Sequence, residues 1–222
     1  MDATALRLSF VLALVTVLVL VPSAMIVSRA LAFHRFRGRG VVEALLALPL
    51  VLPPTVLGFY LLGAFAPDAM LGRIFALLGR PTLAFTFEGL VIASVIANIP
   101  FAIQPMQRGF ESIASELREG AACCGLSPWQ CFRRIELPLA WPGIVSAIAL
   151  VFAHTLGEFG VVLMVGGSIP GETRTASIAI YDRMQAFDTA GAGAMAATLL
   201  VISLTALAIV HSLARRHGAR VD

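Results

Sequence analysis

Five long blocks of mostly apolar residues constrain this sequence more than any other feature. A helix of about 20 apolar residues crosses the roughly 30 Å of hydrocarbon in a bilayer. The blocks therefore predict an all-α integral membrane protein with five transmembrane helices, at residues of about 6–33, 42–65, 87–106, 139–165 and 194–213. Only 13% of the residues are charged, against roughly a quarter in soluble domains. We expect residues 1–222 to form one membrane domain, with no room for a separate soluble catalytic domain.

The distribution of arginine predicts the topology, because cytoplasmic loops of membrane proteins carry an excess of Lys and Arg. The sequence has no Lys, and its Arg residues fall unequally on the two sides of the predicted spans. Eleven lie on the side of the loop 111–138, namely Arg29, Arg35, Arg37, Arg39, Arg108, Arg118, Arg133, Arg134, Arg215, Arg216 and Arg220. Five lie on the other side, namely Arg7, Arg73, Arg80, Arg174 and Arg183. This bias predicts an N-terminus outside the cell, and a C-terminus and a loop 111–138 in the cytoplasm.

Polar groups and helix breakers inside the predicted spans are candidates for a pathway or a gate. Asn98, His154 and Glu158 are costly to place in a membrane, so such residues are functional candidates by default. A histidine in this setting is nevertheless more often an interior residue with satisfied hydrogen bonds. Pro53 and Pro54 remove backbone donors from the second span. They fit equally well a helix that lines a pathway and a simple packing kink.

The sequence offers little for catalysis. The four His residues are scattered, and the sequence contains no phosphate-binding loop of the G-x-x-x-x-G-K type. We therefore expect that the chain is not an enzyme and carries no cofactor or metal. Cys123, Cys124 and Cys131 match no common zinc or disulfide spacing, and small packing residues in a reducing compartment explain them best.

The loop 111–138 has the sequence signals of two short helices joined by a tight turn. The segment 111–124 contains no Pro, and Gly125 is placed to end the first helix as a C-terminal cap. Ser127 is placed to cap a second helix that has Pro128 at its first position. We expect this second helix to end at Pro138, before the fourth span. Such a protrusion suits docking into a groove of another protein, although an amphipathic helix lying on the bilayer is also compatible with the pattern.

The spacing within this loop resembles the EAA loop of binding-protein-dependent ABC importer permeases. The pattern of that family is E-A-A-x-x-x-G-x9-I-x-L-P, and this sequence follows it with Glu119, Gly120, Ala121, Gly125, Ile135, Leu137 and Pro138. One position departs from it, because Gly120 stands where the first Ala is usual. This small-for-small change costs the helix roughly 1 kcal/mol.

Three further segments resemble the molybdate permease subunits within that family, and with the loop they cover nearly the whole chain. These segments are Leu48–Gly58 (LPLVLPPTVLG), Leu156–Gly160 (LGEFG) and Ile169–Thr175 (IPGETRT). Sulfate and thiosulfate permeases are similar in the EAA loop and the EFG segment, but less similar around IPGETRT. The resemblance implies a permease for molybdate, with tungstate, sulfate or thiosulfate as the alternative substrate.

The resemblance also implies a location in the bacterial inner membrane and a set of partner proteins. It implies a type I ABC importer architecture, in which two copies form the pathway as a homodimer. A cytoplasmic ATPase dimer binds ATP and Mg²⁺, and an extracytoplasmic molybdate-binding protein delivers the oxyanion. The ATPase contact is expected at Glu119, Gly120, Ala121, Ala122, Gly125, Leu126, Ile135, Leu137 and Pro138. Replacing Gly125 with Asp is expected to uncouple transport.

The resemblance suggests roles for three charged residues. A carboxylate repels an oxyanion, so for Glu158 we favour a structural or gating role, either paired with an Arg or capping a helix break at Gly157. Glu172 and Arg174 lie in the predicted external loop. They suit contact with the binding protein through complementary charge, or form an ordinary solvated pair.

Two other classes of function fit the sequence less well than a transporter. An intramembrane enzyme needs a reactive Ser, a His or paired carboxylates at matched depth, and the sequence shows no such set. A membrane scaffold without transport activity would not need the spacing of the EAA loop.

Overall fold

The computed structural model describes residues 2–77, 79 and 82–218, and the regular secondary structure of this part is entirely helical. This confirms the all-α prediction. The helices are α1 Ala3–Phe33, α2 Arg39–Val51, α3 Pro54–Phe65, α4 Met70–Leu77, α5 Phe87–Glu111, α6 Ser115–Cys123, α7 Pro128–Cys131, the π-helical turn η1 Phe132–Glu136, α8 Leu137–Gly157, α9 Gly160–Gly166, α10 Ala176–Gln185 and α11 Thr189–Gly218.

Four described helical segments are long and apolar enough to cross a membrane: Ala3–Phe33, Phe87–Glu111, Pro128–Gly157 and Thr189–Ala208. The pair α2 and α3 passes the same test jointly, which gives up to five spans. The connections between the predicted spans, 66–86 and 168–193, contain the helices α4 and α10.

The second predicted span is broken rather than continuous. α2 ends at Val51, α3 begins at Pro54, and their axes differ in direction by 107°. Leu52 and Pro53 between them are extended, because a residue before proline avoids the helical region. The predicted span 42–65 thus consists of two helices that meet at Pro53 and Pro54, and the pair forms either a broken span or a re-entrant loop.

The fourth predicted span, 139–165, is also interrupted. α8 ends at Gly157, Glu158 is extended, and α9 begins at Gly160. The two breaks pack against each other, because a Cβ built on Gly160 would lie 2.7 Å from the Cβ of Pro54. Only a residue without a side chain allows this approach.

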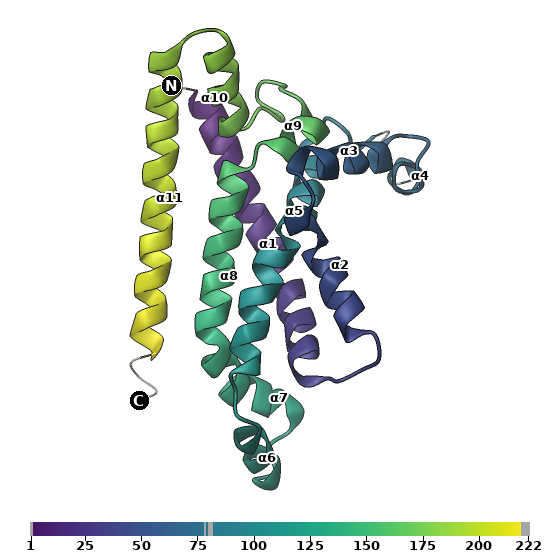
Figure 1. Ribbon diagram of the computed structural model, residues 1–222, viewed down its shortest axis with the longest axis vertical. Coiled ribbons are helices and arrows are strands. Elements are labelled where there is room, and N and C mark those ends of the chain that lie inside the picture. The colour runs from purple at the N-terminus through teal and green to yellow at the C-terminus, as the bar shows by residue number, and fades with distance from the viewer. Residues whose placement is uncertain (1, 78, 80–81, 219–222) are drawn as a thin grey trace.

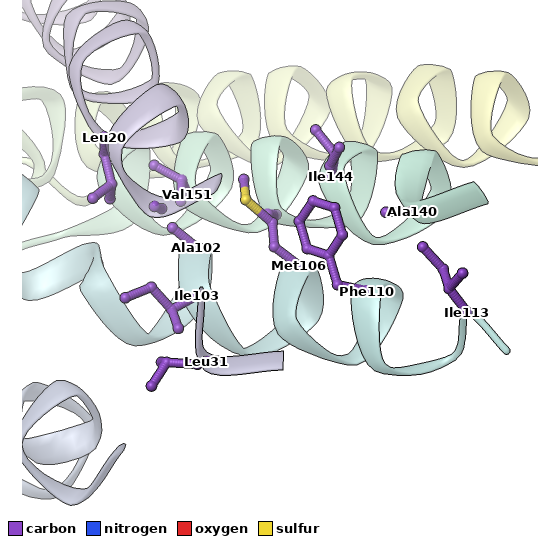
Figure 2. Packing of buried hydrophobic residues seen from close by; sticks show 12 residues of the cluster. Leu20, Leu31, Ala102, Ile103, Met106, Phe110, Ile113, Ala140, Ile144 and Val151 are labelled. Atoms are coloured by element: carbon purple, nitrogen blue, oxygen red, sulfur yellow. The ribbon is translucent and has the colours of Figure 1, made fainter. Parts of the chain in front are cut away.

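The core is formed by α1, α5 and α8. Figure 2 shows Leu20 and Leu31 of α1, Ala102, Met106 and Phe110 of α5, and Ile144 and Val151 of α8, which belong to one buried cluster. The α5 and α8 backbones approach closely at Gly143, where an added Cβ would meet the Pro105 carbonyl oxygen at 2.5 Å and the Gly109 Cα at 3.1 Å. Small residues commonly mediate such contacts between membrane helices.

The two ends of the molecule differ in what they carry. α6 and α7 project beyond the helices at one end, towards which the C-terminal part of α11 also runs (Figure 1). The N-terminus of α1, together with α3, α9 and α10, lies at the other end (Figure 1). The loop that resembles the EAA loop is thus a protrusion, and it lies at the end opposite the N-terminus.

Candidate functional site

The turn after α6 is fixed by a glycine. Leu126 N–H donates to Ala121 O at 3.1 Å and Gly125 N–H donates to Ala122 O at 2.9 Å, which is the hydrogen-bond pattern of a Schellman motif. Gly125 has a φ of +76°, in the left-handed region that favours glycine. The prediction that Gly125 ends this helix is confirmed.

The start of α7 is also encoded locally. Ser127 accepts a hydrogen bond from Gln130 N–H, and the Gln130 side chain accepts one from Ser127 N–H, so the two residues form a capping box. Pro128 occupies the first turn, where its missing N–H costs little. The predicted cap at Ser127 is therefore confirmed.

The second helix of the protrusion does not end at Pro138, contrary to the prediction. α7 passes through η1 into α8, so that residues 128–157 form one continuous helical segment. In η1 the Leu137 N–H bonds to Phe132 O, five residues earlier. This wide π turn makes room for the proline ring in the next turn of the helix. The protrusion is consequently joined to the membrane helix without a hinge.

The predicted coupling residues divide into an exposed group and a packed group. Glu119, Gly120, Ala122, Gly125 and Pro138 are exposed, whereas Ala121 is buried and Leu126, Ile135 and Leu137 are half-buried. The structure adds Leu117 and Trp129, which are 50% and 66% exposed. Exposed apolar residues on a protrusion are a further signal for docking. We name the segment 115–127, α6 with its turn, the coupling unit.

The predicted pathway residues Asn98, His154 and Glu158 form one polar cluster. Asn98 is fully buried, and its amide nitrogen donates to Thr155 Oγ1 at 3.1 Å and Ser94 O at 2.8 Å. His154 Nδ1 lies 3.2 Å from Asn98 Oδ1 and 3.5 Å from Glu158 Oε2, so a proton on Nδ1 serves both acceptors. Phe101 stacks on the imidazole with a centroid distance of 4.2 Å.

Glu158 lies in the break that follows Gly157, as one of the two alternatives expected. Its Oε1 accepts a hydrogen bond from Val161 N–H at 3.3 Å, and its backbone carbonyl accepts one from Ser177 Oγ at 2.6 Å. The side chain that lies against its carboxylate in the structure is His154 rather than an arginine. Because the break packs on Pro54, the cluster lies beside the predicted pathway prolines.

A polar face of α5 was missed by the sequence analysis. Gln104 and Arg108 line two adjoining grooves, of about 290 Å³ and 150 Å³, that lie beside α2. Both residues follow Asn98 and Phe101 at helical spacing, so all four share one face of α5. That spacing was the signal available in the sequence. The face presents an amide and a guanidinium, both of which can donate hydrogen bonds to an oxyanion.

The predicted contacts for a binding protein differ in availability. Glu172 is exposed, whereas Arg174 is paired with Asp2, which also caps α1 by accepting the Ala5 N–H. The Ala5 N–H, and then the Arg174 guanidinium, lower the pKa of Asp2. The alternative of a solvated Glu172–Arg174 pair is therefore wrong, because Arg174 fastens the loop to the start of α1 instead.

Replacing Asn98 with Leu is expected to destabilise the protein by about 1–3 kcal/mol, because His154 and Thr155 lose a buried partner. Thermal unfolding of the detergent-purified protein measures this loss. Thr205→Val is the control, since the Thr205 hydroxyl bonds to Val201 O of its own helix on an exposed face. Equal midpoints for the two variants would contradict the role of Asn98.

Comparison with known proteins identifies the family. The family model described as "Binding-protein-dependent transport system inner membrane component" matches residues 21–219. Molybdenum transport system permease protein ModB of Azotobacter vinelandii is 44% identical over 211 residues, which cover 95% of this chain and 93% of that protein. ModB of Escherichia coli (strain K12) is 36% identical over 84% of this chain and 80% of its own length. Sulfate transport system permease protein CysT of the same organism is 35% identical, over 85% and 68%.

A solved structure shows the same fold. The chain matches the crystal structure of a bacterial ABC transporter involved in the import of the acidic polysaccharide alginate with a TM-score of 0.79 and 18% identity, covering 96% of this chain and 78% of that chain. The family model and the 44% identical relative agree with this architecture. The chain is therefore a multi-pass inner membrane permease that belongs to the family of binding-protein-dependent transport system inner membrane components.

Proposed function

We propose that this chain forms the pathway for molybdate in an ABC importer. The choice of molybdate is supported by the 44% identity to a molybdenum permease over 95% of the chain, against 35% to a sulfate permease over 85%. Tungstate and sulfate or thiosulfate are the alternative substrates, because the same architecture serves related oxyanions. The chain itself is not catalytic.

The geometry that best supports a transporter subunit is the rigid link between the protrusion and the polar cluster. The coupling unit is followed by α7, which continues through η1 into α8 without a break, and α8 carries His154 and ends at Gly157, next to Glu158. An ATPase that grips the coupling unit displaces this continuous helix. The displacement acts on the helix breaks at Pro53 and Glu158, where backbone is already irregular and a gate can open. ATP and Mg²⁺ bind to that partner chain.

The proposed topology places the coupling unit in the cytoplasm, with the N-terminus outside and the C-terminus inside. It is supported by the arginine bias and by the position of the coupling unit at the end opposite the N-terminus (Figure 1). A related structure is described as a bacterial alginate ABC transporter in complex with alginate pentasaccharide-bound periplasmic protein. By analogy, a molybdate-binding protein docks at the outer end, where Glu172 is exposed.

Two copies of the chain are proposed to enclose the pathway. The α5 face with Gln104 and Arg108 supplies donors for an oxyanion, and Arg108 is exposed at the cytoplasmic side. Weak contacts suffice there, because a pathway must release its ion and the binding protein selects it. Glu158 is held by His154 and Val161, which suits a gate better than a substrate contact.

Uptake measurements test the substrate. In a strain deleted for this gene, the restored chain is expected to recover uptake of radiolabelled molybdate at least tenfold, with competition by tungstate and little by a large excess of sulfate. The strain retains the ATPase and the binding protein, so only the permease differs. Recovery of sulfate uptake without molybdate uptake would assign the chain to the sulfate branch, and recovery of neither would reject the proposal.

A further inference from the structure

A buried carboxylate joins the coupling unit to the membrane helices. Glu136, in the π turn η1, is 1% exposed. Its two oxygens bind Arg29 of α1, with Nε–Oε2 at 2.5 Å and Nη2–Oε1 at 3.1 Å. The same Oε1 accepts a hydrogen bond from Arg118 Nε of α6 at 3.1 Å. One side chain thus connects η1 with α6 and with α1, which is distant in sequence.

Aromatic rings complete the surroundings of this cluster. The Arg118 guanidinium lies 3.7 Å from the centroid of the Phe33 ring in α1, and the Arg29 guanidinium lies 5.5 Å from that of Phe132 in η1. Contacts between a cation and the face of a ring add to the ion pairs where water is partly excluded. Arg118 of α6 therefore contacts both Glu136 of η1 and the Phe33 ring of α1.

The position of Glu136 depends on the π turn. Hydrogen bonds between residues five positions apart widen the helix in η1, just before α8. Such π-helical turns commonly occur at functional sites. They place Glu136 on the inner side, although Arg133 and Arg134 in the same turn are exposed. A buried ion pair contributes little to net stability but strongly penalises the loss of one partner. The cluster is thus better suited to fixing geometry than to stabilising the fold.

We propose that Glu136, with Arg29 and Arg118, is a clasp that makes the coupling unit move as one body with α1 and α8. The inference rests on the proposed function, in which an ATPase displaces the coupling unit. Without the clasp, α6 is joined to the bundle through its two loops and its packing on α7. An applied displacement is then absorbed by bending of those loops before it reaches the gate.

Arg118→Met tests the clasp most directly, because it removes the ion pair between α6 and Glu136 and leaves the Arg29–Glu136 pair in place. Arg118 is partly exposed, so the variant is expected to fold. In proteoliposomes with the ATPase and the binding protein, we expect the amount of molybdate transported per ATP hydrolysed to fall at least fivefold. Arg118→Lys keeps the charge and is expected to recover most of the coupling.

The matched control is Arg39→Met, which breaks another arginine cluster at the same end of the molecule. Arg39 pairs with Glu43 of its own helix at 2.9 Å and joins α2 to α5 through Glu111 at 2.7 Å, outside the coupling unit. Its loss is expected to leave transport per ATP unchanged. Wild-type coupling in Arg118→Met, or an equal loss in Arg39→Met, would overturn the proposal.

A second measurement does not depend on the substrate or the ATPase. Hydrogen exchange of the detergent-solubilised chain reports how firmly α6 is held, and Arg118→Met is expected to speed exchange at residues 115–123 at least tenfold relative to wild type and Arg39→Met. Unchanged exchange would refute the clasp itself. Faster exchange with normal coupling would refute its role in transmission, whereas absence of molybdate transport by wild type would refute only the proposed substrate.

Discussion

Replacing Gly143 with isoleucine is expected to prevent accumulation of folded protein in the membrane. A Cβ at this position would lie 2.5 Å from the Pro105 carbonyl oxygen and 3.1 Å from the Gly109 Cα, both in α5. These are backbone atoms, so no side-chain rotation relieves the clash. The α5 and α8 helices must separate, which opens the cluster around Met106 and Ile144. Overpacking of this kind costs about 3 kcal/mol or more, a large part of the stability of a typical domain.

The amount of monodisperse protein in detergent extracts, followed by size-exclusion chromatography, measures this effect. Gly63→Ile is the matched control, because it introduces the same side chain into α3 at a position where a Cβ has no neighbour within 4 Å. We expect the control to accumulate normally and Gly143→Ile to be nearly absent. Equal amounts and equal melting temperatures would show that α5 and α8 are not in backbone contact.

The second large effect is expected from Gly125→Asp, which should reduce molybdate uptake at least tenfold while the isolated chain keeps nearly its normal stability. A Cβ at Gly125 meets no atom of this chain within 4 Å. The positive φ of +76° adds a cost of roughly 1 kcal/mol for a residue with a side chain. The larger consequence arises at the docked surface, where a carboxylate enters a contact otherwise made by small residues. Co-purification with the ATPase and uptake are the two measurements.

Two variants separate the causes. Asn is tolerated at positive φ and is similar in size to Asp, so Gly125→Asn isolates the contribution of the charge. Gly120→Ala restores the residue usual in the family, and its Cβ also meets no neighbour, so uptake should be preserved and the helix slightly stabilised. Normal ATPase assembly and uptake in Gly125→Asp would refute the assignment of the docking surface.

Much of the coupling unit was predictable because its structure is local. The Schellman motif at Gly125 and the capping box at Ser127 join residues three to five positions apart, so their chemistry can be read along the chain. The same local signals predicted wrongly that the helix ends at Pro138. Proline normally ends a helix, and the wide turn that accommodates it here has no simple sequence signal.

The pathway candidates were found as separate residues but not as a cluster. The cost of polar groups in a membrane selected Asn98, His154 and Glu158. That Asn98 bonds to Thr155, and that Glu158 caps α9, follows from the packing of α5 on α8 and from the break after Gly157. Gln104 lies near the end of the predicted span 87–106, and Arg108 lies beyond it. Neither residue was therefore assigned to the inner face of that span.

The sequence by itself determined the class of protein, the approximate spans, the bias in charge and the family. These depend on the length of apolar runs, on composition and on fixed short spacings, all of which are independent of how the helices pack. Only the tertiary structure decided the 107° bend between α2 and α3, the contact of the two helix breaks and the burial of Glu136 between Arg29 and Arg118. Glu136 and Arg29 are 107 positions apart, and a contact across that distance exists only once α1 and α8 are packed side by side.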